Sequence, residues 1–507
     1  MDAGQSKTVA FKIGHTDTIE QLFEIHNQLS VENVYSQLKE VIDCRQNELS
    51  GVKIHTPDEK LNRAFPFYQY ANIMGSQWAR GRSNGFRDKV QDSECLASVN
   101  PNLAWEQTKR ILCYQYSTGY CPRNYLDGTI NPKSSIDNGV WVSGPCYAVV
   151  NEIGNPDIIL EEIPFNDGTV ATVFEHLRRS YEYLYNYQGL YGLIKIWGGD
   201  WHDGMDRAGL EGKGVSILLS IQFIHFNKLF IELAKMLGEN KVAEEHLKMN
   251  EDIHKKIMKY GYFKPYFCTA INDIGEYIGA PESKGAKMYL NPQSWAVIAN
   301  ILNKNELIDC MEYVDEYLET PYGTRFNYPM YTEYDPYIGH MTTQPQGSLI
   351  NGAVYLQPLV WRLIADCILD RKDAVQMTLE KLLPWNHKHA VSYGEPYILY
   401  NFYHETETGY RAGTPGQSWR TATHSIFVRA LINFIFGLKP SVEGLQINPC
   451  LPPEWKKCSI EKQFRNCTYY ISFYQNSGKN EIIADGKLVE GNLLPYHDGK
   501  MLVDVYM

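Results

Sequence analysis

The chain has 507 residues, of which 44% are hydrophobic, so it can bury a large core. Its formal net charge of -11 and the absence of any run of Lys or Arg argue against nucleic acid as a partner, and favour a neutral ligand. No segment offers the roughly 20 uninterrupted apolar residues that span a bilayer, so no membrane partner is expected.

The 11 cysteines form no C-x-x-C pair and no Cys/His spacing suited to zinc. Reduced thiols are the simplest interpretation of such a scattered set. The first 17 residues also lack the apolar core of a secretory signal. We therefore expect a cytoplasmic protein.

Residues 21–434 show a mostly helical pattern, with apolar residues at three- and four-residue spacing and loops rich in Gly, Pro and Asn between them. The pattern predicts a mainly α fold built of helical hairpins. The clearest helices are expected at residues 169–187, 215–237, 241–260, 294–302, 349–369 and 418–436.

Two consecutive helices differ in how their apolar residues are distributed. Residues 215–237 are apolar around most of the circumference, whereas residues 241–260 have one strongly polar face. A helix covered on all sides followed by an amphipathic one is typical of two concentric rings, as in an (α/α) barrel. A helical solenoid has the same pattern and stays an alternative.

The character of the chain changes after residues 437–440. Residues 458–473 and 481–507 contain short β-type segments between Gly and Asn turns, which predicts a small C-terminal β domain. Near the other end, residues 8–13 have the composition of a single strand.

The segment 197–206, Trp-Gly-Gly-Asp-Trp-His-Asp-Gly-Met-Asp, is rich in carboxylates and precedes the apolar helix. A carboxyl group beside Trp rings can have a raised pKa, which keeps it protonated near neutral pH and suits a general acid. This makes Asp203, which follows Trp201 and His202, a candidate. An acidic turn or a helix cap explains the same residues without catalysis.

Arg87 and Asp88 put a guanidinium beside a carboxylate, a mixture that vicinal sugar hydroxyls can use. A surface ion pair is the alternative. Arg80 and Arg82 precede them. Thr421 lies at the start of a predicted helix, where an oxyanion is favoured, although it is equally suited to be an N-cap or a buried, satisfied hydroxyl. No H-E-x-x-H, Walker, Rossmann or G-x-S-x-G pattern has a convincing context, so no cofactor is indicated.

An ordered set of motifs resembles the inverting β-glycan phosphorylases of glycoside hydrolase family 94, which include cellobiose, cellodextrin, laminaribiose and chitobiose phosphorylases. The resemblance covers most of the chain. Its motifs are His55-Thr56-Pro57-Asp58, Gly85-Phe86-Arg87-Asp88 with Gln91-Asp92, Asp137-Asn138 with Trp141, Phe174-Glu175-His176-Leu177, Asp200-Trp201-His202-Asp203, Glu211-Gly212-Lys213-Gly214, Asn291-Pro292-Gln293-Ser294-Trp295, Asn351-Gly352-Ala353, Glu395-Pro396-Tyr397 and Ser418-Trp419.

The resemblance implies an (α/α)6 barrel with a small C-terminal β-sandwich of jelly-roll type, and an N-terminal β-sandwich joined by a helical linker. Only residues 9–13 look like the last strand of that sandwich. We expect a remnant strand and linker at residues 1–50, the catalytic barrel at 51–437 and the β domain at 438–507. The family also implies a homodimer.

The family's roles transfer residue by residue. Asp203 matches the general acid, with His202 in place of the family's Asn. The sugar-binding positions fall on Arg87, Asp88, Trp201, Gln293 and Glu395. The phosphate-binding positions fall on Arg82 or Arg80, Gln357, Thr421 and Ala422, where Gln357 stands in place of a His and Ala422 in place of a Gly.

The function that the resemblance implies is inverting phosphorolysis of a β-glucosidic bond in a di- or oligosaccharide, with inorganic phosphate as co-substrate and α-glucose 1-phosphate as product. An uncharged Gln at position 357 weakens that assignment, because it removes a charge-assisted contact to phosphate. Two alternatives therefore stay open. One is an inverting hydrolase with Glu395 or Glu333 as base, and the other is a sugar-binding protein without catalysis.

Overall fold

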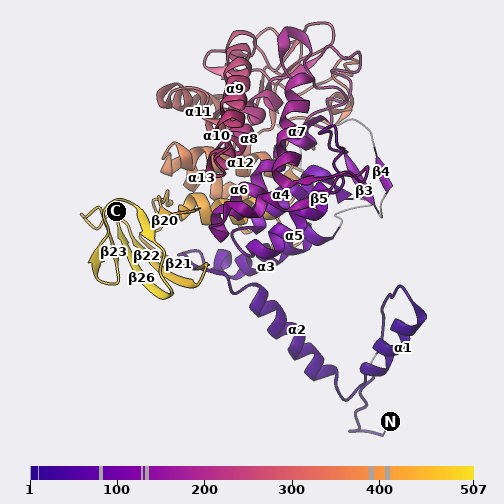
Figure 1. Ribbon diagram of the computed structural model, residues 1–507, viewed down its shortest axis with the longest axis vertical. Coiled ribbons are helices and arrows are strands. Elements are labelled where there is room, and N and C mark those ends of the chain that lie inside the picture. Colours follow the sequence, from indigo (N-terminus) through magenta and orange to yellow (C-terminus); the bar gives the residue numbers. More distant parts are fainter. Residues whose placement is uncertain are drawn as a thin grey trace.

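The computed structural model describes residues 2–9, 11–78, 84–126, 129–131, 136–387, 393–405 and 411–507. A large helical body carries a β region on one side, and two N-terminal helices extend away from the body (Figure 1). The mainly α fold expected from the sequence is therefore confirmed at this level.

The helical body contains helices that alternate along the chain between two sets. Six of them, α4, α6, α8, α10, α12 and α15, contact one another in sequence, and α15 closes the circle by contacting α4. Their bounds are Phe86–Leu96, Ser143–Ile153, Ile217–Met236, Leu290–Ala299, Leu356–Ile368 and Thr423–Arg429. The alternating helices are α3 (Glu59–Gln77), α5 (Pro101–Leu112), α7 (Val173–Asn186), α9 (Asn240–Tyr260), α11 (Lys304–Leu318) and α13 (Lys372–Leu382).

The contrast between the two helices singled out in the sequence is confirmed. Helix α8 is buried along most of its length, and α9 packs against it with a few buried positions, which include Ala243, Ile253 and Ile257. Of the described helices, only α8 is long and apolar enough to cross a membrane, and 78% of its most apolar window is buried inside the protein. Its apolar surface is thus accounted for by packing.

Several helices of the closed circle begin directly after a two-residue strand. β2 (Asn84–Gly85), β7 (Val215–Ser216), β12 (Met288–Tyr289) and β16 (Val354–Tyr355) precede α4, α8, α10 and α12. Each of these strands pairs with a strand from a distant loop. The pairing fixes the N-terminal end of each helix, and four candidate residues, Arg87, Asp88, Gln293 and Gln357, lie in the first turns of α4, α10 and α12.

The β region contains a six-stranded sheet with the order β1-β21-β22-β26-β23-β24 and a three-stranded sheet with the order β19-β20-β25. The long strands are β21 (Lys457–Phe464), β22 (Cys467–Tyr474) and β26 (Gly499–Tyr506), and β22 runs parallel to β26. The shorter strands are β19 (Leu438–Ser441), β20 (Gly444–Ile447), β23 (Glu481–Ala484), β24 (Lys487–Leu488) and β25 (Leu493–Pro495).

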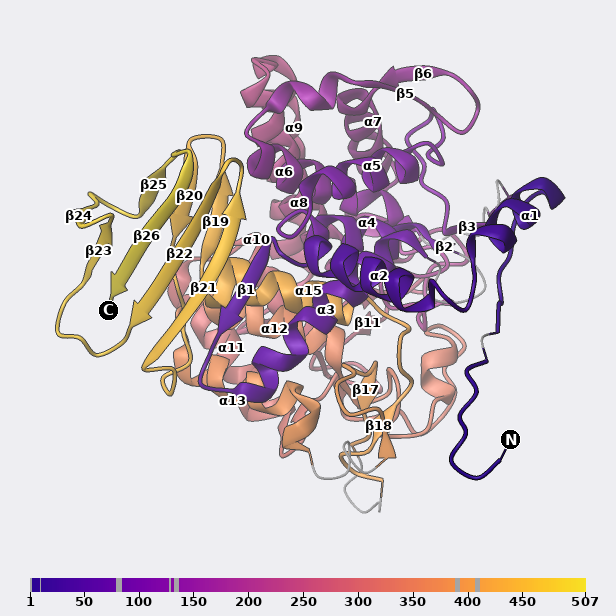
Figure 2. The ribbon, with the colours of Figure 1, turned by 90° about the horizontal axis from the view of Figure 1, so that it is seen from below.

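The edge strand of the six-stranded sheet comes from the other end of the chain. β1 (Val52–His55) pairs antiparallel with β21, with Val52 opposite Lys462 (Figure 2). The sequence-based boundary at residue 51 places this segment in the barrel, whereas the structure places it in the C-terminal sheet. Val52 and Ile54 alternate with exposed residues and are buried, as a half-buried strand requires.

The N-terminal segment differs from its prediction. Residues 8, 9 and 11–13 form no strand, and Phe11 and Ile13 are almost fully exposed. A lone strand has no partner for its backbone hydrogen bonds, so β-type composition alone does not suffice. Helices α1 (Ile19–Gln28) and α2 (Val34–Glu48) lie where the helical linker is expected, and neither buries a residue.

Candidate active site

The loop that carries Asp203 is fixed from within by Asp200. Both carboxylate oxygens of this fully buried residue accept hydrogen bonds, from the backbone N–H of His202 at 2.7 Å and from the hydroxyl of Ser216 at 2.5 Å. Burial raises the pKa of Asp200 to about 6. Asp200 thus joins the loop to the N-cap of α8, and it is a structural rather than a reacting carboxylate.

His202 anchors the next residue of the loop in the core. Its Nε2 lies 3.1 Å from the side-chain amide nitrogen of Asn291, and its Nδ1 lies 3.4 Å from the hydroxyl of Thr269. Burial lowers the pKa of His202 to about 3, so the ring is neutral at physiological pH. An amide that donates to Nε2 leaves the ring proton on Nδ1.

Asp203 follows these two anchors and faces solvent, with 45% of its side chain exposed. Its Oδ1 lies 2.9 Å from Nη2 of Arg87 and 3.5 Å from Nη2 of Arg123. The loop therefore presents one accessible carboxylate between two guanidinium groups.

Arg87, in the first turn of α4, is held by three oxygens from different segments. Its Nη1 donates to the buried carboxylate of Asp137 at 2.8 Å and to the carbonyl of Asp200 at 3.0 Å, and its Nη2 reaches Asp203. Only 12% of the Arg87 side chain is exposed, so the alternative of a surface ion pair with Asp88 is wrong. These contacts orient the guanidinium before any ligand binds.

Arg123 is a residue that the sequence analysis missed. It directly precedes β3 (Asn124–Leu126), which pairs with β2, and its carbonyl accepts a hydrogen bond from the backbone of Phe86 at 3.0 Å. This pairing brings Arg123 beside the start of α4. No local sequence signal marks Arg123, because its position depends on a contact between segments almost 40 residues apart.

The other expected sugar-binding residues occupy different environments. The carboxylate of Asp88 folds back over the start of α4, so close to Gly85 that a Cβ there would lie 2.0 Å from it. Trp201 is 7% exposed and packs edge-on against Trp361 at 4.8 Å between ring centroids. Exposed Glu395 accepts a hydrogen bond from Ser418 at 3.1 Å, which joins two motifs distant in the sequence.

Gln293 does not line a sugar site in this structure. It is fully buried in α10, and its amide exchanges hydrogen bonds with the backbone N–H and carbonyl of Phe267, at 2.9 and 2.8 Å. Its nitrogen also donates to the carbonyl of Tyr289. A glutamine whose donors and acceptor are engaged by backbone in the core has no capacity left for a ligand, so the expected role is corrected to a structural one.

Hydrogen bonds join both α12, which carries the expected phosphate ligand Gln357, and α15 to α4. Gln357, 2% exposed at the start of α12, donates to Gln91 at 3.1 Å. Ser425 of α15 donates to Asp92 at 2.6 Å. Gln91 and Asp92 lie one helical turn beyond Arg87 and Asp88, so α4 connects the two groups of candidates.

Thr421 and Ala422 precede α15. The Thr421 hydroxyl lies 2.6 Å from that of Thr423, and the fully buried Ala422 occupies the N-cap position. Because the N-cap is Ala422, the alternative in which Thr421 caps the helix is wrong. Arg80 and Arg82 lie outside the described residues.

Comparison with known proteins places these motifs in a family. The model of the glycosyl hydrolase 94 superfamily catalytic domain matches residues 45–437. Solabiose phosphorylase of Paenibacillus borealis is 29% identical over 457 residues, which cover 88% of this chain and 59% of that protein.

A second relative from the same organism, 3-O-beta-D-glucopyranosyl-beta-D-glucuronide phosphorylase, is 23% identical over 99% of this chain and 67% of its own length. The chain thus spans about three fifths to two thirds of these relatives. Among solved structures, the GH78 family rhamnosidase of Bacillus sp. GL1 matches with a TM-score of 0.56 at 9% identity, covering 90% of this chain and 44% of that one. This likeness concerns the fold alone.

Proposed function

Because the chain belongs to the glycosyl hydrolase 94 superfamily, we propose that it performs inverting phosphorolysis of a β-glucosidic bond in a di- or oligosaccharide and releases α-glucose 1-phosphate. The relatives named above are phosphorylases, which supports this reaction class. The observation that carries the proposal is the exposed carboxylate of Asp203, fixed beside Arg87 and Arg123.

For the architecture we propose an (α/α)6 barrel followed by a β-sandwich of jelly-roll type. The closed circle of six contacting helices and the six that alternate with them support the barrel. The two C-terminal sheets support the sandwich. We also propose a cytoplasmic location, which the 11 free cysteines support.

In the proposed reaction Asp203 gives its proton to the glycosidic oxygen as the C1–O bond breaks. A phosphate oxygen attacks C1 from the opposite face, and its new bond to C1 inverts the anomeric configuration. Phosphate is already an anionic nucleophile, so no second carboxylate is needed to activate water, in contrast to an inverting hydrolase.

The pairing of Asp203 with Arg87 bears on how Asp203 becomes available to the substrate. A general acid needs a carboxyl oxygen that is free to reach the glycosidic oxygen. We propose that a hydroxyl group of the bound sugar replaces the Asp203 carboxylate as the partner of Nη2 of Arg87. Asp137 and the Asp200 carbonyl keep the guanidinium in place during this exchange.

For phosphate we propose a site between the start of α15 and α4, with the hydroxyl of Thr421, the backbone N–H of Ala422 and Gln357 as donors. Arg82 or Arg80 stays the proposed cationic ligand of phosphate, from outside the described residues. An anion is favoured at a helix N-terminus, and guanidinium groups suit phosphate.

Two assays test the proposal. The reverse reaction combines α-glucose 1-phosphate with a panel of β-glucoside acceptors and measures the phosphate released. The forward reaction measures cleavage of the β-glucoside with and without phosphate. We expect phosphate-dependent turnover that Asp203→Asn lowers by about 10²–10⁴-fold or more. The matched control is Asp206→Asn, since Asp206 lies in the same loop, contacts His340 and makes no ion pair with an arginine that the structure describes.

Equal turnover in phosphate-free buffer would favour the hydrolase, and Glu395→Gln and Glu333→Gln then identify its base. Oligosaccharide binding without turnover in either buffer would favour the non-catalytic alternative. Loss of activity in both Asp203→Asn and Asp206→Asn would show that the loop, rather than one acid, is required.

A further inference from the structure

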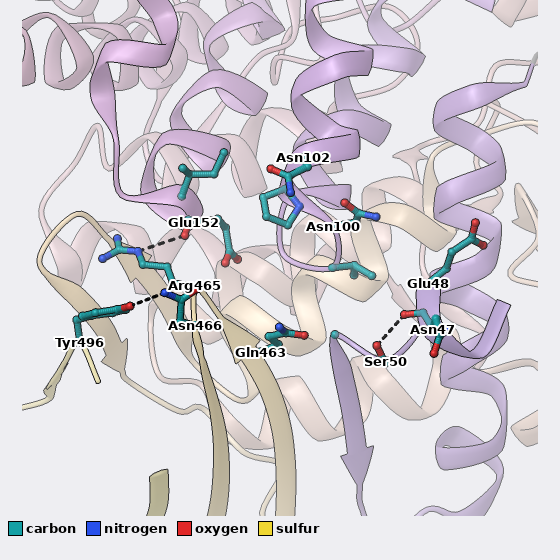
Figure 3. A pocket seen from close by; sticks show the side chains of 14 residues that line it. Asn47, Glu48, Ser50, Asn100, Asn102, Glu152, Gln463, Arg465, Asn466 and Tyr496 are labelled. Atoms are coloured by element: carbon teal, nitrogen blue, oxygen red, sulfur yellow. Dashed lines mark hydrogen bonds between the residues drawn. The ribbon is translucent and has the colours of Figure 1, made fainter. Parts of the chain in front are cut away.

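A cavity of about 610 Å³ lies where the linker helix, the helical body and the C-terminal sheet meet (Figure 3). None of its residues belongs to the Asp203 site. It is bounded by the end of α2, the start of α5, the end of α6, the turn between β21 and β22, and Tyr496. Its size is within the roughly 300–1,000 Å³ typical of small-molecule sites.

The charged side chains around this cavity are committed to partners within the protein. Buried Glu152 pairs with Lys462 at 2.9 Å, and Glu48 pairs with Arg45 at 2.6 Å. The guanidinium of Arg465 donates to four backbone carbonyls, at residues 151, 152, 441 and 442. The cavity therefore offers no uncommitted charge from these side chains, and an ionic ligand such as phosphate gains little from it.

The polar groups of the cavity that remain available to a ligand are side-chain amides. Asn47, Asn102 and Gln463 make no side-chain hydrogen bond to any residue that the structure describes, and Asn100 uses only its Oδ1, to cap α5 through Leu103 at 3.1 Å. In Figure 3, Asn100 and Asn102 lie across the space from Gln463. Each free amide offers an acceptor and two donors, the pattern that pairs with vicinal hydroxyls.

An aromatic ring completes the lining. Tyr496 is 43% exposed, and its hydroxyl is held between the amide nitrogen of Asn466, at 3.0 Å, and the carboxylate of Asp498, at 2.5 Å. The hydroxyl is thereby committed, whereas the ring stays accessible. A ring that is already oriented loses little conformational freedom when an apolar surface stacks on it.

We infer that this cavity is a second carbohydrate site, which binds a neutral oligosaccharide through the amides of Asn47, Asn100, Asn102 and Gln463 and the ring of Tyr496. The linker helix, the helical body and the C-terminal sheet all contribute residues to this site, so the C-terminal sheet takes part in binding. A substrate chain held here has a raised local concentration at the protein. The inference does not require turnover and stands apart from the reaction proposed for Asp203.

The experiment uses the full chain with Asp203→Asn, so that no probe is consumed, and isothermal titration calorimetry with cellotetraose, laminaritetraose and maltotetraose. We expect binding of at least one probe that is weakened tenfold or more by Asn102→Ala with Gln463→Ala. Both side chains are exposed, and neither makes a side-chain hydrogen bond within the described residues. Asn240→Ala, an exposed amide at the start of α9, is the matched control.

Tyr496→Ala and Tyr496→Phe separate stacking from hydroxyl contacts. The site predicts weaker binding for Ala and nearly unchanged binding for Phe. In the background with an intact Asp203, the Asn102/Gln463 variant should keep its turnover of a disaccharide within twofold. Oligosaccharide affinities that all these variants leave unchanged would overturn the inference. So would an absence of binding by every probe, whatever the result for phosphorolysis.

Discussion

Arg87 joins two carboxylates of unequal exposure, since its Nη2 lies 2.9 Å from Asp203, which is 45% exposed, while its Nη1 lies 2.8 Å from Asp137, which is fully buried. The buried partner fixes the guanidinium, and the exposed one can exchange it for a ligand. This asymmetry separates the structural role of Arg87 from its proposed role in sugar binding.

Replacing Arg87 tests that separation. Arg87→Ala removes the ion pair that Arg87 makes with buried Asp137 at 2.8 Å, and we expect the free energy of unfolding to fall by about 3–5 kcal/mol, as for other broken buried ion pairs. Turnover should be lost as well. Chemical denaturation and steady-state kinetics measure the two effects.

The double variant Arg87→Ala with Asp137→Asn is the control. The amide that replaces the Asp137 carboxylate carries no charge, so most of the lost stability should return, whereas turnover should not. Recovery of turnover together with stability would contradict a role for Arg87 in binding the sugar.

The helical body is predictable from sequence because helical periodicity is a local property. The apolar circumference of α8 and the polar face of α9 both follow from residues within one segment. β1 is different, since its partner β21 lies some 400 residues away and four alternating residues carry no sign of that pairing. Residues 9–13 show the converse, because β-type composition without a partner gives no strand.

The site was predictable to the extent that its motifs resemble a family. The resemblance points to Asp203 and Arg87, which the structure brings to 2.9 Å. It misplaces Gln293, whose amide is engaged by the backbone of Phe267, and it does not point to Arg123, which reaches the site through the β2–β3 pairing. Both differences come from non-local backbone geometry.

His202 is predicted to position Asp203 rather than to react. His202→Ala removes the partner of the buried amide of Asn291, which should cost about 1–3 kcal/mol of stability. The loosened loop should lower kcat more than it raises KM. His202→Asn places the family's residue there and should recover part of kcat. A kcat that is unchanged in His202→Ala would contradict the positioning role.

Gln357 is the position where the sequence departs from the family's His, and it gives a test of the phosphate site. At a pH where the new imidazole is charged, Gln357→His should lower the KM for phosphate by roughly ten- to a hundredfold, the equivalent of about 1.5–3 kcal/mol for a charge-assisted hydrogen bond. Gln357→Leu, which leaves Gln91 without its donor, should raise that KM. Steady-state kinetics at varied phosphate concentration distinguish these outcomes, and thermal melts confirm that each variant folds. If neither substitution changes the KM for phosphate, the phosphate site does not include this part of α12.

Stability should fall in mild acid because buried histidines stay neutral in the folded protein. Burial lowers the pKa of His202 to about 3 and that of His246 to about 4, whereas an unfolded His titrates near 6.5. The unfolded state therefore binds more protons below pH 6.5, and each group lowers the free energy of unfolding by about 1.4 kcal/mol per pH unit until its own folded pKa is reached. Denaturation midpoints between pH 7.5 and 4.5 measure this slope of stability against pH.

His246→Gln tests the contribution of one histidine. The glutamine can still donate to Asn227, and the variant should show a smaller slope of stability against pH below pH 6.5 while being less stable at pH 7.5. A slope identical to that of the wild type would show that His246 does not contribute to it.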